Sequence, residues 1–145
     1  MDPKLTLYIN VVCIWIGFGG CMLAATLYPR RFLFVSPLNW GMAVVNGLAG
    51  HILPAVLTSS YNPGAFQSLF MVPLGIYIIR KSERPLLCIA NGILMHLILI
   101  MSVNIIFRFH TDEAITMSGF MLLASLVLPL AIANYVSTLN KQKCK

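Results

Sequence analysis

The sequence predicts an all-α, polytopic membrane protein: a single domain, residues 1–145, of five transmembrane helices with the N-terminus outside and the C-terminus inside. Of the 145 residues, 59% are apolar and only 10% are charged, and the mean hydropathy is +0.85. So few polar side chains cannot cover the surface of a soluble domain of this size. The apolar residues also fall into stretches of about 20, the length of helix that spans a bilayer, with short basic clusters between them.

Four apolar stretches are long enough to cross a bilayer as helices. They are residues 5–27, 39–58, 86–107 and 115–139. A further stretch, residues 63–79, is shorter and contains Pro73, so its hydropathy alone is also compatible with a re-entrant segment.

The distribution of basic residues favours five crossings. If all five stretches cross, one side of the membrane receives only two of the ten Lys and Arg residues, Lys4 and Arg108. The other side receives Arg30, Arg31, Arg80, Lys81, Arg84, Lys141, Lys143 and Lys145. Because cytoplasmic loops are enriched in Lys and Arg, this asymmetry predicts that the C-terminus is inside. The net charge of +6 then reflects membrane orientation, and we expect the lipid bilayer, not nucleic acid, as the partner.

The first stretch carries a row of small residues. Gly17, Cys21 and Ala25 recur at intervals of four, so on an α-helix they share one face and permit close contact with a second helix. The stretch is longer than the apolar core of a signal peptide, and Arg30 and Arg31 follow it instead of preceding it. We therefore expect it to be retained as a helix.

Prolines mark the later stretches. Pro63 follows the outer loop and stands where a helix would begin, a position at which its missing backbone N–H is not needed. Three other prolines lie inside stretches, and each leaves the carbonyl four residues earlier without a helical partner. The pairs are Pro54 with Gly50, Pro73 with Leu69 and Pro129 with Ser125. We expect kinks at these points, and a cavity near Pro54 would adjoin His51.

Asp112 and Glu113 stand at the start of the last stretch. Carboxylates in the first turn of a helix complement its dipole, and this is the role that we favour. A metal site formed together with the neighbouring His110 is the alternative.

Two pairs of segments suggest an internal repeat. Residues 46–51 read NGLAGH and residues 91–96 read NGILMH, each in a stretch that begins inside. Residues 72–76 (VPLGI) and 128–132 (LPLAI) follow them in the next stretch. The second and third helices would then form a hairpin that the fourth and fifth repeat in parallel, about an axis along the membrane normal.

His51 and His96 are the ionisable residues that the prediction places at bilayer depth, where such residues are costly and often functional. Facing each other at similar depth, they would suit a bis-histidine haem or a divalent metal. The structural alternative is hydrogen bonding in the polar interior, to Asn46, Asn91 or Asn104. Asn46 and His51 are five residues apart, about 140° around an α-helix. We therefore do not expect these two to pair with each other.

Tyr61, Pro63 and Gly64, with His51 ten residues before Tyr61, form a pattern in the outer loop. This pattern resembles the HXXEE domain family of small bacterial membrane proteins. Members carry an HXXEE motif on an early helix, a further histidine and a YXPG motif, and their activity is unassigned. The resemblance covers residues 15–80. It implies a multi-pass protein of a cell membrane, the bacterial cytoplasmic membrane, with His51 as the further histidine.

The HXXEE motif itself is replaced. The matching place reads CMLAA, with Cys21 for the histidine and Ala24 and Ala25 for the two glutamates. In a family member the three side chains share one helical face and suit a metal together with the second-helix histidine. The resemblance therefore implies either a degenerate member that kept its packing and lost its chemistry, or a different placement of the motif.

Three functions remain open. The first is a non-enzymatic membrane protein that binds a small apolar ligand or a membrane partner, including a second copy of the chain, and the absent carboxylates favour it. The second is a haem- or metal-binding redox protein that uses His51 and His96. The third is an enzyme or transporter subunit with an outward-facing site near Tyr61, His51 and the Asp112–Glu113 loop.

Overall fold

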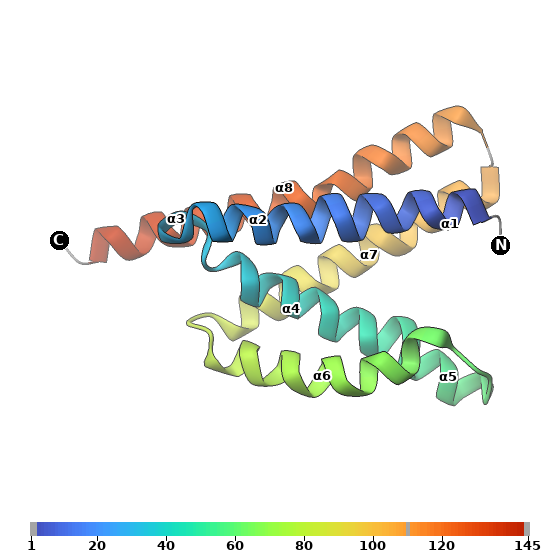
Figure 1. The fold of residues 1–145 in the computed structure, drawn as a ribbon, viewed down its shortest axis with the longest axis horizontal. Coiled ribbons are helices and arrows are strands. Elements are labelled where there is room, and N and C mark those ends of the chain that lie inside the picture. Colours follow the sequence, from blue (N-terminus) through green and yellow to red (C-terminus); the bar gives the residue numbers. More distant parts are fainter. Residues whose placement is uncertain (1–2, 110, 144–145) are drawn as a thin grey trace. The chain divides into compact units, whose positions relative to one another are not determined.

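The structure, a computed structural model, describes residues 3–109 and 111–143, and among these residues it contains helices and no strand (Figure 1). Two of the helical segments, η1 and η2, are π-helices, in which backbone hydrogen bonds join residues five apart. In chain order the elements are α1 (Pro3–Asn10), η1 (Val11–Gly19), α2 (Gly20–Leu27), α3 (Pro29–Phe32), α4 (Val35–Val45), η2 (Asn46–Ile52), α5 (Leu53–Thr58), α6 (Pro63–Lys81), α7 (Pro85–Phe109) and α8 (Asp112–Lys143).

Four of the helical stretches among the described residues are long and apolar enough to span a membrane. They are Leu7–Leu27, Val35–Thr58, Pro85–Phe109 and Asp112–Gln142. This finding confirms the all-α class and the four stretches that the sequence marks most clearly. The helix α6, of 19 residues, is not one of the four.

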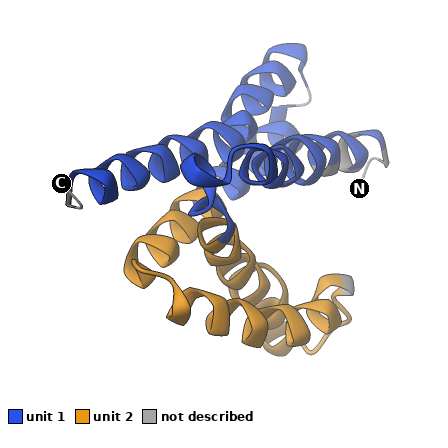
Figure 2. Cartoon of the chain, turned by 60° about the vertical axis from the view of Figure 1, so that its left-hand side comes forward, with its two compact units in different colours: residues 1–36, 97–145 blue, residues 37–96 orange. Residues whose placement is uncertain are grey.

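The chain divides into two compact units. Unit 1 comprises Met1–Ser36 and Leu97–Lys145, and unit 2 comprises Pro37–His96 (Figure 2). The helix α7 passes from unit 2 into unit 1 at His96. Whether the two units act as the single domain expected from the sequence stays a prediction.

In unit 1, the rod formed by α1, η1 and α2 packs in parallel against α8. Tyr8 Oη donates a hydrogen bond to the Ile115 carbonyl oxygen at 3.3 Å, and Cys21 Sγ lies 3.6 Å from the Leu126 carbonyl oxygen. Further along both helices, Ser137 Oγ donates to the Arg30 carbonyl oxygen at 2.9 Å. Residue numbers rise together on the two sides, so the helices run in the same direction.

The small residues of this rod permit the close contact. Gly17, Cys21 and Ala25 are all buried. A Cβ atom at Gly17 would collide with Ser125 Oγ on α8. The predicted row of small residues is therefore the surface on which α8 packs.

In unit 2, α6 runs antiparallel beside α4 and η2. Gly75 packs against Trp40 and Val44, whereas Gly47 packs against Val72. Residue numbers on α6 fall as those on α4 and η2 rise, so the two form a helical hairpin. One end of this hairpin, here called the outer end because the sequence predicts that it faces outside, holds His51 and the loop from residue 59 to residue 62.

The start of α7 also belongs to unit 2 and crosses α4 at backbone contact distance. A Cβ atom at Gly92 would collide with the Gly41 carbonyl oxygen, and one at Gly41 would collide with the Cys88 carbonyl oxygen. Next to this crossing, Asn91 Nδ2 donates a hydrogen bond to the Leu38 carbonyl oxygen at 3.2 Å. Only glycine permits so close an approach of two helices.

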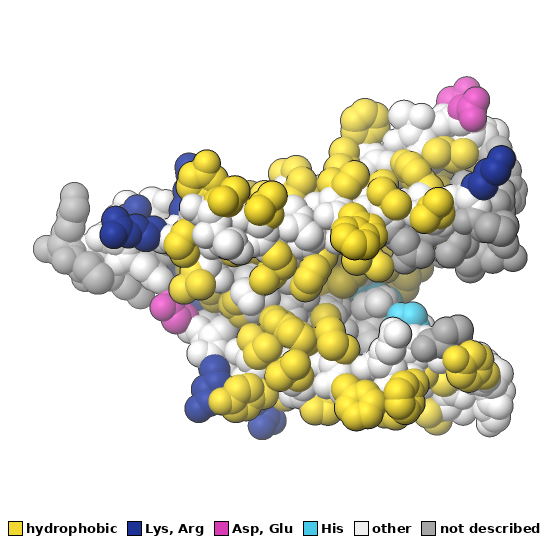
Figure 3. Space-filling model, viewed as in Figure 1, with side chains coloured by type: hydrophobic (Ala, Val, Ile, Leu, Met, Phe, Trp, Pro, Cys, Tyr) yellow, Lys and Arg dark blue, Asp and Glu magenta, His cyan; other side chains and the backbone are white. Residues whose placement is uncertain are grey.

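Large apolar side chains lie on the outside of both units. Trp15, Leu57 and Phe120 are each more than 70% exposed, and apolar side chains cover much of the face drawn in Figure 3. A surface of this kind is unfavourable in water and favourable in hydrocarbon.

Carboxylates stand in the first turn of α8, as predicted. Asp112 and Glu113 occupy that turn, and Thr111 Oγ1 caps the helix by accepting a hydrogen bond from the Ala114 N–H at 3.2 Å. Their suggested metal partner His110 lies outside the described residues. Among the described residues, no group of three or more His, Cys, Asp and Glu side chains could hold a metal ion.

Candidate functional site

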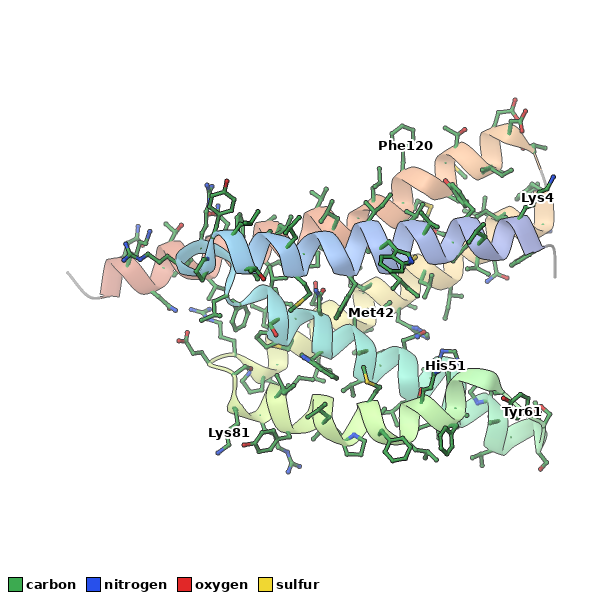
Figure 4. All side chains as sticks on the ribbon, in the orientation of Figure 1. Lys4, Met42, His51, Tyr61, Lys81 and Phe120 are labelled. Carbon is green, nitrogen blue, oxygen red and sulfur yellow. The ribbon has the colours of Figure 1, made fainter. Side chains whose placement is uncertain are left out.

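The candidate site lies in unit 2, at the outer end of the hairpin, where η2 meets the loop that leads into α6. Figure 4 labels His51 between α4 and α5, and Tyr61 in this loop. The structure brings together the π-helix η2, the Tyr61–Gly64 segment and the start of α7. Of the predicted residues, Asn46, His51, Gly64 and His96 take part.

Asn62 joins the loop to η2. Its Oδ1 accepts a hydrogen bond from the Gly64 N–H at 3.1 Å, which caps α6, and Pro63 occupies the first helical position. This confirms the helix start predicted from Pro63. The same Oδ1 lies 3.0 Å from His51 Nδ1. Because this oxygen can only accept, His51 Nδ1 carries the proton.

The π-helix brings Asn46 and His51 together. Asn46 Nδ2 lies 3.4 Å from His51 Nε2. The expectation that these residues do not pair is wrong, because it assumed the α-helical period. In a π-helix, residues five apart are neighbours on one face. His51 therefore has a hydrogen-bond partner at each ring nitrogen.

Asn62 also satisfies a carbonyl that a proline leaves without its helical partner. Pro54 has no N–H to offer to the Gly50 carbonyl oxygen, and Asn62 Nδ2 donates to that oxygen at 3.5 Å. The freed carbonyl predicted from the sequence is thus used to attach the outer loop. A cavity near Pro54 stays a prediction.

Gly64 lies against the imidazole ring of His51. A Cβ atom at this position would collide with three atoms of the ring. In the Tyr-Asn-Pro-Gly segment, the glycine therefore allows the ring to approach, and the asparagine holds it. Tyr61 is 87% exposed and points away from this contact.

His96 approaches η2 from α7. Its side chain is only 7% exposed, and Nδ1 is buried and has no hydrogen-bond partner in the part of the chain that the structure describes. Its Cε1 lies 3.4 Å from the place that a Cβ atom of Gly50 would occupy, and Asn46 Oδ1 lies 2.7 Å from the same place. Because Gly50 has no side chain, the side chains of both His96 and Asn46 can approach this position of η2.

The two histidines differ in their surroundings. His51 lies in a π-helix with both ring nitrogens bonded, whereas His96 lies in the α-helix α7 with Nδ1 unpaired. The segments 46–51 and 91–96 of the predicted repeat therefore differ in helix type.

The other predicted polar residues have separate roles. Asn91 is buried at the crossing of α4 and α7, and its Oδ1 has no hydrogen-bond partner, nor does Nδ2 of the buried Asn39. Asn104 was expected in the polar interior, but it is exposed, and its Nδ2 donates to the Ile100 carbonyl of its own helix at 2.8 Å. Because this hydrogen bond is made within α7, the Asn104 amide does not require a partner on another helix.

Cys21, which the resemblance sets at the histidine position of an HXXEE motif, lies in unit 1, whereas His51 and its partners lie in unit 2. It is fully buried, and its Sγ lies 3.8 Å from the Ser125 carbonyl oxygen that Pro129 leaves free. Ala25 is buried and Ala24 is half-buried on the same helix. In this chain the motif position packs α2 against α8.

Two residues of the site, Asn62 and Gly50, are not among the candidates named from the sequence. Asn62 could have been recognised, because an asparagine directly before Pro-Gly at a helix start is a strong capping signal. Gly50 could not, because its role depends on the approach of His96 from another helix.

No protein-family model matches this sequence, and neither the curated proteins nor the solved structures contain a significant match to it.

Proposed function

We propose that the chain is a five-span protein of a cell membrane, with its N-terminus outside and its C-terminus inside, and that unit 2 binds a small, mostly apolar ligand at His96. The role is binding, not catalysis. The observation that carries this proposal is the buried Nδ1 of His96, which has no hydrogen-bond partner among the described residues, whereas both ring nitrogens of the neighbouring His51 have one.

The antiparallel register of α6 supports the fifth crossing. The helix runs beside α4 and η2, from Gly75 near Trp40 to Gly64 near His51, and α4 and η2 belong to a stretch long enough to span a membrane. At 1.5 Å per residue, its 19 residues measure about 28 Å, close to the thickness of the hydrocarbon core.

Contacts inside unit 1 support the orientation. Arg31 Nε donates to Asn134 Oδ1 at 2.6 Å, and Ser137 Oγ bonds the Arg30 carbonyl oxygen. The first basic cluster therefore lies beside the part of α8 that leads to Lys141. Basic residues gathered at one end of a bundle are typical of its cytoplasmic side.

An unpaired buried polar atom favours a ligand over simple packing. Leaving such a group without a partner costs about 1–3 kcal/mol, and more in hydrocarbon, where water cannot reach it. At the neighbouring His51, by contrast, Asn62 and Asn46 supply a hydrogen-bond partner for each ring nitrogen. The motif position at Cys21, which packs helices, is consistent with a degenerate HXXEE-like protein that has kept its architecture.

Copurification tests the proposal. Protein purified in mild detergent should carry a small organic compound that mass spectrometry detects in a fixed ratio to the chain. A His96→Phe variant, which keeps an aromatic ring but has no nitrogen, should lose that compound. Asn104→Leu, an exposed position on the same helix, is the matched control and should retain it. Equal amounts in all three proteins, or none in the wild type, would contradict a ligand site at His96.

Haem or a divalent metal is the second candidate, and one observation favours it. His51 donates its Nδ1–H to an amide oxygen, which is how metal-bound histidines are usually oriented. However, His51 Nε2 faces the Asn46 amide and would have to exchange that bond for a metal. A Soret band, or a metal that His51→Ala removes, would establish this candidate in place of the first.

A further inference from the structure

The hydrogen bonds around η2 determine which chemical group the site presents toward His96. The Gly64 backbone N–H can only donate a hydrogen bond. Asn62 Oδ1 accepts from it, so the same oxygen must also accept from His51 Nδ1–H. In the neutral ring, His51 Nε2 then carries a lone pair.

That lone pair fixes the orientation of Asn46. His51 Nε2 accepts a hydrogen bond, so Asn46 must present its NH2 group to the ring. Its carbonyl oxygen therefore points to the opposite side, where Oδ1 lies 2.7 Å from the place of a Gly50 Cβ atom. No hydrogen bond to this oxygen is formed by the described residues.

The two residues that approach Gly50 each have an atom with no hydrogen-bond partner among the described residues: the acceptor Asn46 Oδ1, and the buried His96 Nδ1, which is bonded to the Cε1 atom that lies nearest Gly50. The separation of Asn46 Oδ1 from His96 Cε1, the atom bonded to Nδ1, is no more than about 6 Å. Two hydrogen bonds to one oxygen atom, each about 2.8 Å long, bridge a distance of this size.

We propose that this pair binds the hydroxyl group of a lipid-soluble alcohol. The inference rests on the proposed function and names its ligand class. The hydroxyl donates its proton to Asn46 Oδ1 and accepts a hydrogen bond from His96 in the ring tautomer that carries the proton on Nδ1. A ketone or an ether offers no donor to Asn46, and an ammonium group carries a charge that is costly at this depth.

The neighbouring residues favour a ligand that arrives from the lipid. Leu48 and Leu53 of η2 and α5 are exposed on either side of Gly50 in the sequence. They offer apolar surface to the body of an amphiphile while its hydroxyl reaches the polar pair. Water could bridge the same two atoms, and the experiment below distinguishes it from an alcohol.

The probe is a long-chain primary alcohol that carries a diazirine and an alkyne, applied to the purified full chain in lipid nanodiscs. Its methyl ether, identical except for the hydroxyl hydrogen, is the control probe. After irradiation, mass spectrometry of the peptides should show saturable labelling near residues 46–53 and 93–97. Loss of the donated hydrogen bond should make the ether about tenfold weaker as a ligand.

Three variants and one control variant sharpen the test. Gly50→Ala places a methyl group between Asn46 Oδ1 and His96 Cε1 and should abolish labelling, as should His96→Phe. His96→Asn, whose amide reaches about as far as Nδ1, should retain part of it. Asn104→Leu should label like the wild type. Circular dichroism and gel filtration identify any variant that fails to fold.

Equal labelling by alcohol and ether, or labelling that His96→Phe leaves unchanged, would overturn the hydroxyl assignment while a ligand site could stand. No saturable labelling by either probe in the folded wild type would also overturn it, would leave water as the occupant of the pair, and would count against the proposed function as well. If Gly50→Ala does not fold, the ether and His96→Phe still decide the outcome.

Discussion

Asn62 is the residue on which the outer end of unit 2 depends. One amide caps α6, holds His51 Nδ1 and bonds the Gly50 carbonyl oxygen. His51 and Gly50 lie on η2, whereas Gly64 lies in the first turn of α6, so this one amide joins the two elements of the hairpin. The contribution of Asn62 therefore exceeds that of an ordinary helix cap.

Replacing Asn62 by alanine should lower the free energy of unfolding by about 2–3 kcal/mol, because a cap is worth about 1 kcal/mol and two further, partly buried hydrogen bonds are lost. Thermal unfolding in detergent, followed by circular dichroism, measures the loss. Ser60→Ala in the same exposed loop is the control and should change stability by less than about 0.5 kcal/mol. Similar losses of unfolding free energy in the two variants would show that Asn62 contributes no more to stability than another residue of this loop.

Gly64 makes a second residue-scale prediction. Alanine at this position would collide with the His51 ring, so Gly64→Ala should destabilise the protein by about 1–3 kcal/mol. Gly19→Ala is the control, because a Cβ atom there would meet only the Ile14 carbonyl oxygen at 3.5 Å. That substitution should be neutral or slightly stabilising. Equal unfolding temperatures for both variants would contradict the contact between Gly64 and His51.

Single residues were predictable where the signal is local. Pro63 marked the start of α6, and Gly17, Cys21 and Ala25 marked a packing face, because both patterns depend on backbone geometry within one segment. The pairing of Asn46 with His51 was not, since it depends on a π-helical turn. In a chain that is 59% apolar, hydrophobic periodicity is too weak to separate the α-helical from the π-helical period.

At the scale of elements, the crossing of α4 and α7 brings the backbones of two helices of unit 2 into direct contact. Gly92 lies against the Gly41 carbonyl, and a backbone atom cannot turn away as a side chain can. The sequence contains both glycines but no pattern that links them, because η2, α5 and α6 lie between α4 and α7 along the chain.

Gly92→Ala should therefore weaken unit 2 more than an equivalent change elsewhere in the same unit. We expect a loss of about 2–3 kcal/mol, or failure to fold. Gly47→Ala is the comparison: its Cβ atom would lie 2.8 Å from Val72 Cγ2, a side-chain atom that can move. The loss there should be about 1 kcal/mol or less. The reverse order of the two unfolding temperatures would contradict the crossing.

At the scale of the whole molecule, the five-span topology depends on whether α6 crosses the membrane. The structure contains four helical stretches with the length and hydropathy of a span, and the crossing of α6 rests on its register beside α4 and on the distribution of charge. Hydropathy predicts these four stretches because the length and the apolar content of each are properties of that stretch alone. The fifth depends on neighbours and loops, which the composition of one segment does not describe.

Cysteine accessibility measures this crossing directly. One cysteine is introduced at a time, at Ser60 or at Glu83, which flank α6, with the tail residue Cys144 changed to serine. The parent protein, which keeps Cys13, Cys21 and Cys88, gives the background reaction. Intact right-side-out membranes are treated with an impermeant maleimide. The account predicts that Ser60→Cys reacts from outside and that Glu83→Cys reacts only after the membrane is permeabilised. Reaction of both cysteines from the same side would show that α6 does not cross, and would contradict the five-span topology.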